Sequence, residues 1–478
     1  MRFSENFGLN RSQAYLDFVD VPLHTDLQVF LEPGAIKSLQ SPWGSELASL
    51  LQSFFETVLK LIKSGNHTKA QSLLSSLNER NEFHLGYSSG ESRGHGFGAG
   101  SAKNVWLELT QSQAAITGLL KDLEDTALLV PGVGSDMISD AICNIIRGPL
   151  IKYTQDMCVY YGVPLTPDIP SGPIWNPQAE RWEQSYVPLP MVKGYGKVIL
   201  VPKVLVRFRL SYDSGEYYRH YILPQMQQEH IDSGSNLVEV LKNGEQRVTK
   251  KALMAKYGKD KLAIVEQTKV RPDVLQGYRD DKAKTPSLPI PLDSFSEIEA
   301  SPPPDMDELL KELKAIPPGK KHATDYENVI EKIMSVVFYP SLCNPRKQDQ
   351  IHQGRKRIDI TYVNESKSGF FYWLSIHYSC AHIFVECKNY GSEVGNPEID
   401  QLSSRFSKSR GQVGILICRS IQDKKLLRTR CVDTAKDGRG YMLTLDDDDI
   451  IELVNSYNIS GDNQQFPLLR DLWSQLVK

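Results

Sequence analysis

The spacing of hydrophobic residues predicts helices in the first third of the chain. Within 44–65, GSELASLLQSFFETVLKLIKSG, these residues recur three and four positions apart, and Gly65 is a residue type that commonly ends a helix. The same spacing is present in 111–129 and 136–162. We therefore expect residues 1–165 to form a mixed, helix-rich N-terminal domain.

The pattern changes in the middle of the chain. A Pro-rich stretch at 163–178 indicates a boundary, and the apolar run that follows at 196–212, GKVILVPKVLVRFRLSY, favours strands. Residues 215–231 favour a helix that is kinked or broken at Pro224. These features predict a middle α+β domain over 166–267 with a recognition or regulatory role.

A polar, Pro-rich stretch then precedes the last part of the chain. It contains TPSLPIPLDSFSEIEASPPPDMDEL, a composition typical of a linker, which we place at 268–305. Residues 306–478 return to regular apolar spacing. Their expected order is helix 324–338, strands 357–363, 370–378 and 382–389, helix 397–408, strand 412–418, and helices near 422–434, 448–456 and 465–477. This order predicts a compact C-terminal α/β domain in a multidomain α+β protein.

Composition narrows the class of protein. The chain has 478 residues, of which 40% are hydrophobic and 24% charged, and this suits about two to four packed domains. The net charge of −3 argues against a protein that coats nucleic acid through overall positive charge. This net charge is compatible with a local basic patch.

Signals for membrane insertion and export are not expected. No apolar run reaches the roughly 18 residues that a membrane span needs, and the N-terminal MRFSENFGLN has no apolar signal core. The seven cysteines include no C-x-x-C pair. This favours reduced thiols in a cytoplasmic protein without a structural zinc site.

One apolar segment, HIFVECKNYG at 382–391, carries an acid and a base. Glu386 and Lys388 are two residues apart on the predicted strand, so their side chains point to the same face. An isolated pair of this kind is most often a strand-face ion pair or a solvated edge. Here Asp359 lies on a neighbouring predicted strand, which favours a shared functional site instead.

The chemistry of these residues suits a divalent metal. Asp359 and Glu386 can supply carboxylate ligands and the Cys387 main-chain carbonyl a third oxygen, a donor set that suits Mg²⁺. A bound metal lowers the pKa of its water and neutralises charge on a phosphate. Lys388 can orient that water or help to deprotonate it.

Together these motifs resemble those of the PD-(D/E)XK nuclease superfamily, which has the restriction-endonuclease-like fold. The details are most similar to its Mrr-type branch and comprise YE at 326–327, RIDI at 357–360, ECKNY at 386–390, DQLSSRF at 400–406 and GQVGILICRS at 411–420. The resemblance covers residues 320–455. It departs from the superfamily pattern at Ile358, because no proline precedes Asp359.

The resemblance implies an αβββαβ core that hydrolyses DNA phosphodiester bonds with Mg²⁺, for which Mn²⁺ can substitute. By this similarity Asp359 and Glu386 are expected metal ligands and Lys388 is the expected catalytic lysine.

Two flanking helices would complete the site. Glu327, in the preceding helix, is expected to assist the metal, with Glu331 one helical turn away as a competing candidate. Gln401, in the following helix, is expected to position groups at the site.

Basic residues directly precede Asp359. The segment 343–357, CNPRKQDQIHQGRKR, contains Arg346, Lys347, Arg355, Lys356 and Arg357. Beside a metal site, such residues suit contacts to DNA phosphates, which position DNA without reading its sequence. A solvated loop is the alternative.

We therefore expect a metal-dependent DNA endonuclease, and family analogy points to restriction or anti-phage defence. The expected partners are DNA, a second copy of the chain (because cutting both strands takes two sites) and a partner protein at the N-terminal regions, with no membrane. Two alternatives stay open: a nucleic-acid-binding sensor or scaffold with latent or weak cleavage, and a nuclease for RNA or branched DNA.

Overall fold

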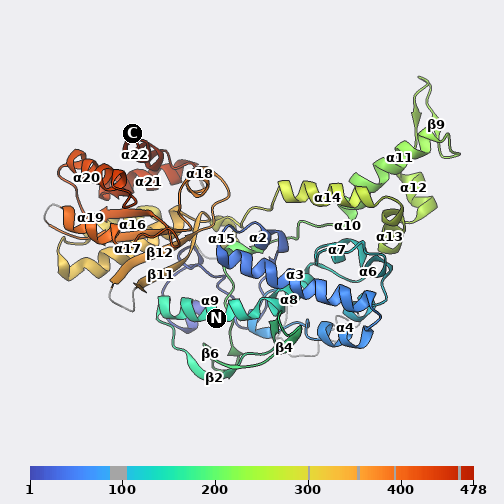
Figure 1. Ribbon diagram of the computed structural model, residues 1–478, viewed down its shortest axis with the longest axis horizontal. Helices are drawn as coiled ribbons and strands as arrows, with labels where there is room; N and C mark the ends of the chain where they lie inside the picture. The colour runs from blue at the N-terminus through green and yellow to red at the C-terminus, as the bar shows by residue number, and fades with distance from the viewer. Residues whose placement is uncertain (87–104, 300–301, 352–355, 392–393, 461–463) are drawn as a thin grey trace.

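The computed structural model describes the chain except for residues 87–104, 300–301, 352–355, 392–393 and 461–463. It contains two hydrophobic cores. The first core comprises buried residues from Phe3 to Phe295, with Cys343, and the second core comprises those from Leu292 to Leu476, with Ala14. Figure 1 shows the second core at one end of the molecule, in orange and red. Within the described part of the chain, no helix has both the length and the apolar character that crossing a membrane requires.

Helices make up most of the N-terminal part of the first core. They are α1 (Phe3–Asn6), α2 (Pro33–Lys37), α3 (Pro42–Lys63), α4 (His67–Leu74), α6 (Gln113–Ile116), α7 (Asp125–Leu129), α8 (Ser135–Ile145) and α9 (Arg147–Tyr161). The longest, α3, begins after Ser41, whose hydroxyl accepts a hydrogen bond from the N–H of Gly44 at 3.0 Å. The helices expected at 44–65 and 136–162 are confirmed. The helix expected at 111–129 is instead divided into α6 and α7.

Short strand pairs occupy much of the middle of the chain. They are β1 (Phe30–Leu31) with β8 (Val206–Arg207), β2 (Thr166–Pro170) with β5 (Tyr186–Leu189), β3 (Ile174–Asn176) with β4 (Arg181–Glu183), and β6 (Met191–Val192) with β7 (Gly196–Lys197). The prediction of strands over 196–212 is therefore wrong for most of that stretch. Val198 to Val201 are buried outside any strand, and Pro202 has no N–H to donate to a sheet.

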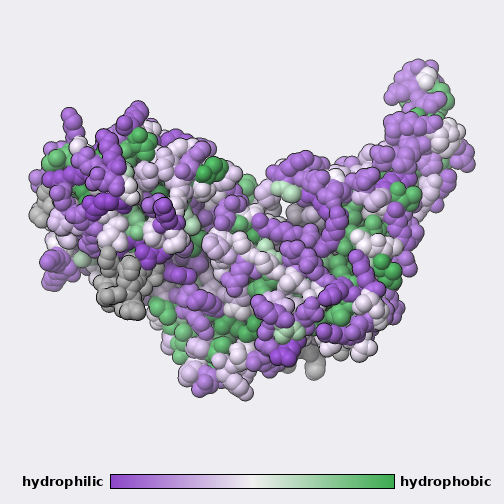
Figure 2. Space-filling model, in the orientation of Figure 1, coloured by the Kyte–Doolittle hydropathy of each residue, from purple (hydrophilic) through white to green (hydrophobic). Residues whose placement is uncertain are grey.

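An arm projects from the rest of the molecule (Figure 1). The projecting part, also seen in Figure 2, consists of α11 (Leu223–Asp232), the hairpin of β9 (Glu239–Val240) and β10 (Gln246–Arg247), and α12 (Lys250–Tyr257). It is joined to the first core by α10 (Ser214–Tyr217), a π-helical turn (Tyr218–Ile222) and α13 (Lys261–Val270). Pro224 lies in the first turn of α11, directly after the π-helical turn, where a missing N–H is tolerated. The helix expected at 215–231 is confirmed, with a local widening at Pro224.

Helices also form within 268–305, the stretch whose composition is typical of a linker. α14 (Pro272–Lys284) buries Tyr278 and α15 (Leu292–Glu299) buries Phe295, both in the first core. This core also continues across the predicted borders near 165 and 267. The division of the chain into domains stays a prediction.

A five-stranded sheet forms the centre of the second core. Its strands are β11 (Leu342–Ile351), β12 (Lys356–Asn364), β13 (His382–Lys388), β14 (Val413–Cys418) and β15 (Tyr441–Leu445), in that spatial order. β12 is antiparallel to both β11 and β13, whereas β14 and β15 continue the sheet in parallel with β13. The surrounding helices are α16 (Met306–Ala315), α17 (Ala323–Val337), α18 (Gly369–His377), α19 (Asn396–Ser403), α20 (Lys424–Lys436), α21 (Asp447–Ser460) and α22 (Pro467–Leu476). The mixed α/β character expected here is confirmed.

Two elements of this part correct the predicted order. Residues 370–378, expected as a strand, form α18, in which Phe370, Phe371 and Leu374 are buried. That spacing is helical, and a short apolar run does not by itself distinguish a helix from a strand. Residues 342–351, for which no helix or strand was predicted, form the edge strand β11. The order of a helix, three strands, a helix and a strand is thus present as α17, β11, β12, β13, α19 and β14, with α18 inserted after β12.

Candidate active site

Strands β12 and β13 bring Asp359 and Glu386 together. Their register pairs Ile360 with Val385, so Asp359 and Glu386 are the next residues along the two strands. The Asp359 carboxylate accepts a hydrogen bond from the main-chain N–H of Cys387 at 2.9 Å. A side chain thus continues the pairing of the strands and keeps the Asp359 carboxylate beside Glu386.

Glu386 and Lys388 lie on the same face of β13, as the alternation of side chains predicts. Glu386 is fully buried, Lys388 is 9% exposed, and the Lys388 Nζ lies 3.3 Å from Glu386 Oε2. The structure therefore brings together Asp359, Glu386 and Lys388, the three residues on which the predicted site depends.

Helix α19 adds Gln401. The helix begins after Gly395, whose N–H donates to the Glu398 carboxylate at 3.0 Å and so fixes the first turn. Gln401 Nε2 donates to Glu386 Oε2 at 3.2 Å, and Gln401 Oε1 accepts from Lys388 Nζ at 3.5 Å. One amide side chain therefore connects the acid to the base.

Arg405, just beyond the end of α19, is a site residue that sequence reasoning missed. Its Nε donates to Glu386 Oε1 at 3.3 Å, and its side chain is buried. Glu386 consequently has a cation at each oxygen, Arg405 at one and Lys388 at the other. One signal was available, because Arg405 follows Gln401 by four residues, the spacing that places two residues on one face of a helix.

The two neighbouring carboxylates change the ionisation of Glu386. Burial and the negative charge of Asp359 raise the pKa of Glu386 to about 7, against the opposing charges of Lys388 and Arg405. Burial lowers the pKa of Lys388, but the charges of Glu386 and Asp359 outweigh burial and raise it overall. The site therefore keeps Lys388 protonated, and the pKa of Glu386 stays raised although Lys388 and Arg405 both contact its carboxylate.

Helix α17 carries both glutamates that were candidates for the site. Burial raises the pKa of the Cys387 thiol, and nearby carboxylates, Glu327 among them, raise it further. Glu327 therefore lies within electrostatic reach of the site. Glu331 is fully buried, and its carboxylate pairs with Arg11 of the first core at 2.8 Å. Glu331 thus takes part in the contact between the cores, and Glu327 remains the candidate.

Two basic residues of β11 contact the first core. Arg346 pairs with Asp156 of α9 at 3.6 Å. Lys347 Nζ lies 5.4 Å from the centroid of the Tyr160 ring and donates to Asn328 Oδ1 at 2.8 Å. Both residues are close to the site, and both have partners within the chain.

The other three basic residues of this segment lie at its far end. Arg355 is outside the described residues, and the structure describes the main chain of Lys356 and Arg357 in β12 without their side chains. Contact of the segment with DNA stays a prediction.

The donor set at the site fits a divalent cation held by two acids. Asp359 and Glu386 supply carboxylates, and the Cys387 carbonyl is the next oxygen along β13. In the part of the chain that the structure describes, no group of three or more His, Cys, Asp or Glu side chains is arranged to hold a metal. Mg²⁺, which keeps several waters and takes one or two carboxylates, is compatible with so small a set.

Comparison with known proteins gives one match, and it lies outside this site. A family described as "Domain of unknown function (DUF8370)" matches residues 8–213, which are part of the first core. Neither the curated proteins nor the solved structures gave a match. The match therefore contains none of the site residues Asp359, Glu386 and Lys388.

Proposed function

We propose that the second core is a metal-dependent endonuclease with the restriction-endonuclease-like fold of the PD-(D/E)XK superfamily, and that it hydrolyses phosphodiester bonds in DNA. One observation supports this most: the Asp359 and Glu386 carboxylates are adjacent, and Lys388 Nζ lies 3.3 Å from Glu386. Two adjacent carboxylates, of which Glu386 is fully buried, repel each other and favour a cation between them. The lysine on the same face adds a group that can act on water and phosphate.

Each residue has a distinct role in the proposed reaction. Mg²⁺, when bound, lowers the pKa of a water molecule and offsets the charge on the phosphate. Asp359, Glu386 and the Cys387 carbonyl would hold it. Lys388 would orient the attacking water and stabilise negative charge on the phosphate, and Gln401 would keep the Lys388 ammonium in place.

Nucleic-acid binding with latent cleavage is a second candidate, and one observation favours it. Both Glu386 oxygens have partners, Arg405 at Oε1, and Lys388 and Gln401 at Oε2. This arrangement satisfies Glu386 without a metal, so a bound cation must displace at least one partner. In this case the site would need a signal, for example through the first core, to become active.

Digestion of several nucleic acids by the full-length protein separates the two candidates. Supercoiled plasmid, linear, methylated and single-stranded DNA, branched DNA and RNA are each incubated with Mg²⁺, with Mn²⁺ and with EDTA. We expect cleavage of plasmid DNA with either metal and none with EDTA. Binding of DNA without cleavage in any metal supports the second candidate.

Matched variants connect the activity to the site. Asp359→Asn should abolish cleavage and leave the fold intact. Asp400→Asn is the control, because Asp400 lies one residue from Gln401 but is exposed and pairs with Arg439 on the surface. Undiminished cleavage by Asp359→Asn contradicts the proposed site.

We also propose that the protein acts as a dimer or higher oligomer in cytoplasmic restriction or anti-phage defence, with a partner protein at the first core. Two active sites are needed to cut both strands of a duplex in one encounter. Sedimentation with and without DNA measures the assembly, and a strict monomer that linearises plasmid in one binding event contradicts it.

A further inference from the structure

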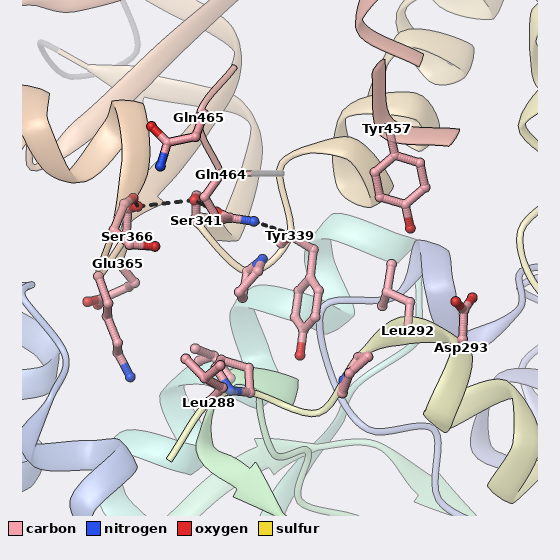
Figure 3. A pocket seen from close by; sticks show the side chains of 16 residues that line it. Leu288, Leu292, Asp293, Tyr339, Ser341, Glu365, Ser366, Tyr457, Gln464 and Gln465 are labelled. Atoms are coloured by element: carbon pink, nitrogen blue, oxygen red, sulfur yellow. Dashed lines mark hydrogen bonds between the residues drawn. The ribbon is translucent and has the colours of Figure 1, made fainter. Parts of the chain in front are cut away.

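A cavity of about 600 Å³ lies where the chain passes from the first core to the second (Figure 3). Ile290 belongs to the first core and Leu292 to the second, and the segment around them forms part of the lining. The other walls come from the segment after α17, the turn after β12 and the segment before α22. A volume of this size is typical of small-molecule sites.

Aromatic and apolar groups form one part of the lining. Figure 3 shows Tyr339, Leu292 and Tyr457 there, from three different segments. The Tyr339 hydroxyl donates to the main-chain oxygen of Ile290 at 2.9 Å, which holds its ring in place. Walls of this kind suit a planar ring.

Polar groups form another part of the lining. The Ser341 hydroxyl lies 3.1 Å from the Ser366 hydroxyl and donates to the Gln464 side chain. Glu365, an acid in this wall, is already occupied, because its carboxylate accepts from the main-chain N–H of Gln40 at 2.7 Å. The lining therefore offers hydrogen-bonding groups, and its buried acid is bound to the first core.

Three cations lie at or behind this lining, and in the described part of the chain main-chain oxygens or, for Lys367, the Ser38 hydroxyl accept their hydrogen bonds. Lys203 is 2% exposed and lies 4.7 Å from the centroid of the Tyr339 ring. Arg207 is 3% exposed and donates to the main-chain oxygen of Ser287 at 2.9 Å. Lys367 lines the cavity itself. A charged group that a neutral acceptor satisfies gains further from an opposite charge, so an anionic group in the cavity would add a charge-assisted contact at Lys367.

Burial lowers the pKa of both lysines, although nearby carboxylates oppose the change. Burial and the charge of Arg207 lower the pKa of Lys367 to about 8. Burial lowers the pKa of Lys203 to about 8 as well.

We propose that the cavity binds a ligand of the nucleotide class, with its planar ring against Tyr339 and Tyr457 and its anionic group at Lys367. A purely apolar ligand would leave Lys367 without an anionic partner, and a bare inorganic anion would leave the aromatic wall uncovered. Because residues of both cores line the cavity, the ligand also stabilises the contact between them. The proposal does not depend on the nuclease activity of the second core.

Calorimetric titration of the full-length protein tests the proposal. The Asp359→Asn variant is used, so that cleavage of nucleic acid plays no part, and AMP, GMP, CMP and UMP are titrated separately. Adenosine and inorganic phosphate serve as controls for the ring alone and the anion alone. We expect at least one monophosphate to bind to a single site, about tenfold or more tighter than either control.

Two variants locate the binding in the cavity. Lys367→Gln removes the lining cation and should weaken binding about tenfold. Leu288→Trp fills the cavity from a side chain that is 75% exposed, so the fold tolerates the change, and it should block binding. Lys193→Gln, at an exposed lysine in the turn between β6 and β7, is the control and should leave binding unchanged.

Three results overturn the proposal. The first is that no monophosphate binds. The second is that a monophosphate binds but both Lys367→Gln and Leu288→Trp bind it as the parent protein does, with circular dichroism showing that each variant is folded. The third is that phosphate alone binds as tightly as the nucleotides. None of these results bears on the active site at Asp359.

Discussion

Two pairs of carboxylates in the second core each meet a lysine, but their surroundings differ. At the start of α21, the main-chain N–H of Asp446 donates to Asp449 at 3.0 Å, and that of Asp449 donates to Asp446 at 3.2 Å. Lys424 bonds to both carboxylates, at 2.8 and 3.0 Å. Although burial opposes it, the hydrogen bond from Lys424 lowers the pKa of Asp446. This pair is satisfied by the chain itself and serves as a helix cap.

The pair at the end of β13 has fewer main-chain donors. Asp359 accepts one main-chain N–H, from Cys387, and Glu386 has side-chain partners, including Lys388. The pKa of Glu386 is raised to about 7 by burial and by Asp359.

The difference shows that residue types alone do not define such a site. Both regions combine two acids with one lysine close to the end of a strand. Main-chain N–H groups and Lys424 bond to both carboxylates of the first pair, whereas the partners of Glu386 are the side chains of Lys388, Gln401 and Arg405, which a metal ion can displace.

Removing the lysine from each pair should give the largest difference in cleavage rate between the two regions. Lys388→Met should slow plasmid cleavage about 10²–10⁴-fold, because it removes a group that acts on the water and phosphate. Lys424→Met should leave the rate within about twofold, since its role is to hold a helix cap. Initial nicking rates measure both, and equal losses in the two variants contradict the comparison.

Glu331 is a third buried acid of the second core, and its cationic partners are Arg11 and Lys347. Arg11→Ala should lower the free energy of unfolding by about 3 kcal/mol, the lower end of the range for breaking a buried pair, because Lys347 remains 3.6 Å from Glu331. Lys332→Ala is the control, since Lys332 pairs with Glu312 near the surface, and it should cost less than about 1 kcal/mol. Urea unfolding measures both. An effect of Arg11→Ala as small as that of the control shows that the contact between the cores does not depend on this pair.

The pH dependence of stability should report the raised pKa of Glu386. Below its ordinary pKa of 4.5 the carboxyl is protonated in both the folded and unfolded states, and above about 7 it is ionised in both. Between these values only the unfolded state releases the proton, so the free energy of unfolding should fall as pH rises, by up to about 3 kcal/mol. Glu386→Gln should lack this part of the fall.

Mg²⁺ provides the control for that prediction. Because a bound cation stabilises the ionised carboxylate, saturating Mg²⁺ should reduce the fall in the parent protein and have little effect in Glu386→Gln. Thermal unfolding across the pH range, with and without Mg²⁺, measures this fall in stability. If the free energy of unfolding falls equally with pH in the parent protein and in Glu386→Gln, the raised pKa is wrongly assigned to Glu386.

The smallest effect is expected at Asp400. Its pair with Arg439 at 2.6 Å is largely exposed, so Asp400→Ala should change the free energy of unfolding by less than about 1 kcal/mol and leave the cleavage rate unchanged. A large loss of cleavage would show that the acid next to Gln401 takes part in the site.

Local patterns were sufficient to predict part of the site. The period of two along a strand places Glu386 and Lys388 on one face, and the structure brings Asp359 to the same end of the neighbouring strand. Arg405 falls within the helix expected at 397–408, one turn after Gln401, but α19 ends at Ser403, and no local pattern shows that this arginine is buried against Glu386. The pairing of Glu331 with Arg11 joins residues 320 apart, and no local pattern indicates such a contact.

The secondary structure was likewise predictable only where the local pattern of apolar residues is clear. Residues 136–162 have a clear helical period, and the helices form as expected. The run at 370–378 is so rich in apolar and aromatic residues that a strand and a helix fit it almost equally, and only the packing of α18 decides between them. The basic stretch at 342–351 lacks an apolar period, and it becomes strand β11 because it pairs with β12.

Binding of Mn²⁺, followed by electron paramagnetic resonance, tests the central claim most directly. In a titration of the full-length protein we predict one bound ion per chain at the candidate site. That ion should be lost in Asp359→Asn and in Glu386→Gln, and kept in Asp446→Asn, which alters the other carboxylate pair. Equal Mn²⁺ binding by the parent protein and by Asp359→Asn would contradict the claim that these carboxylates share a metal ion.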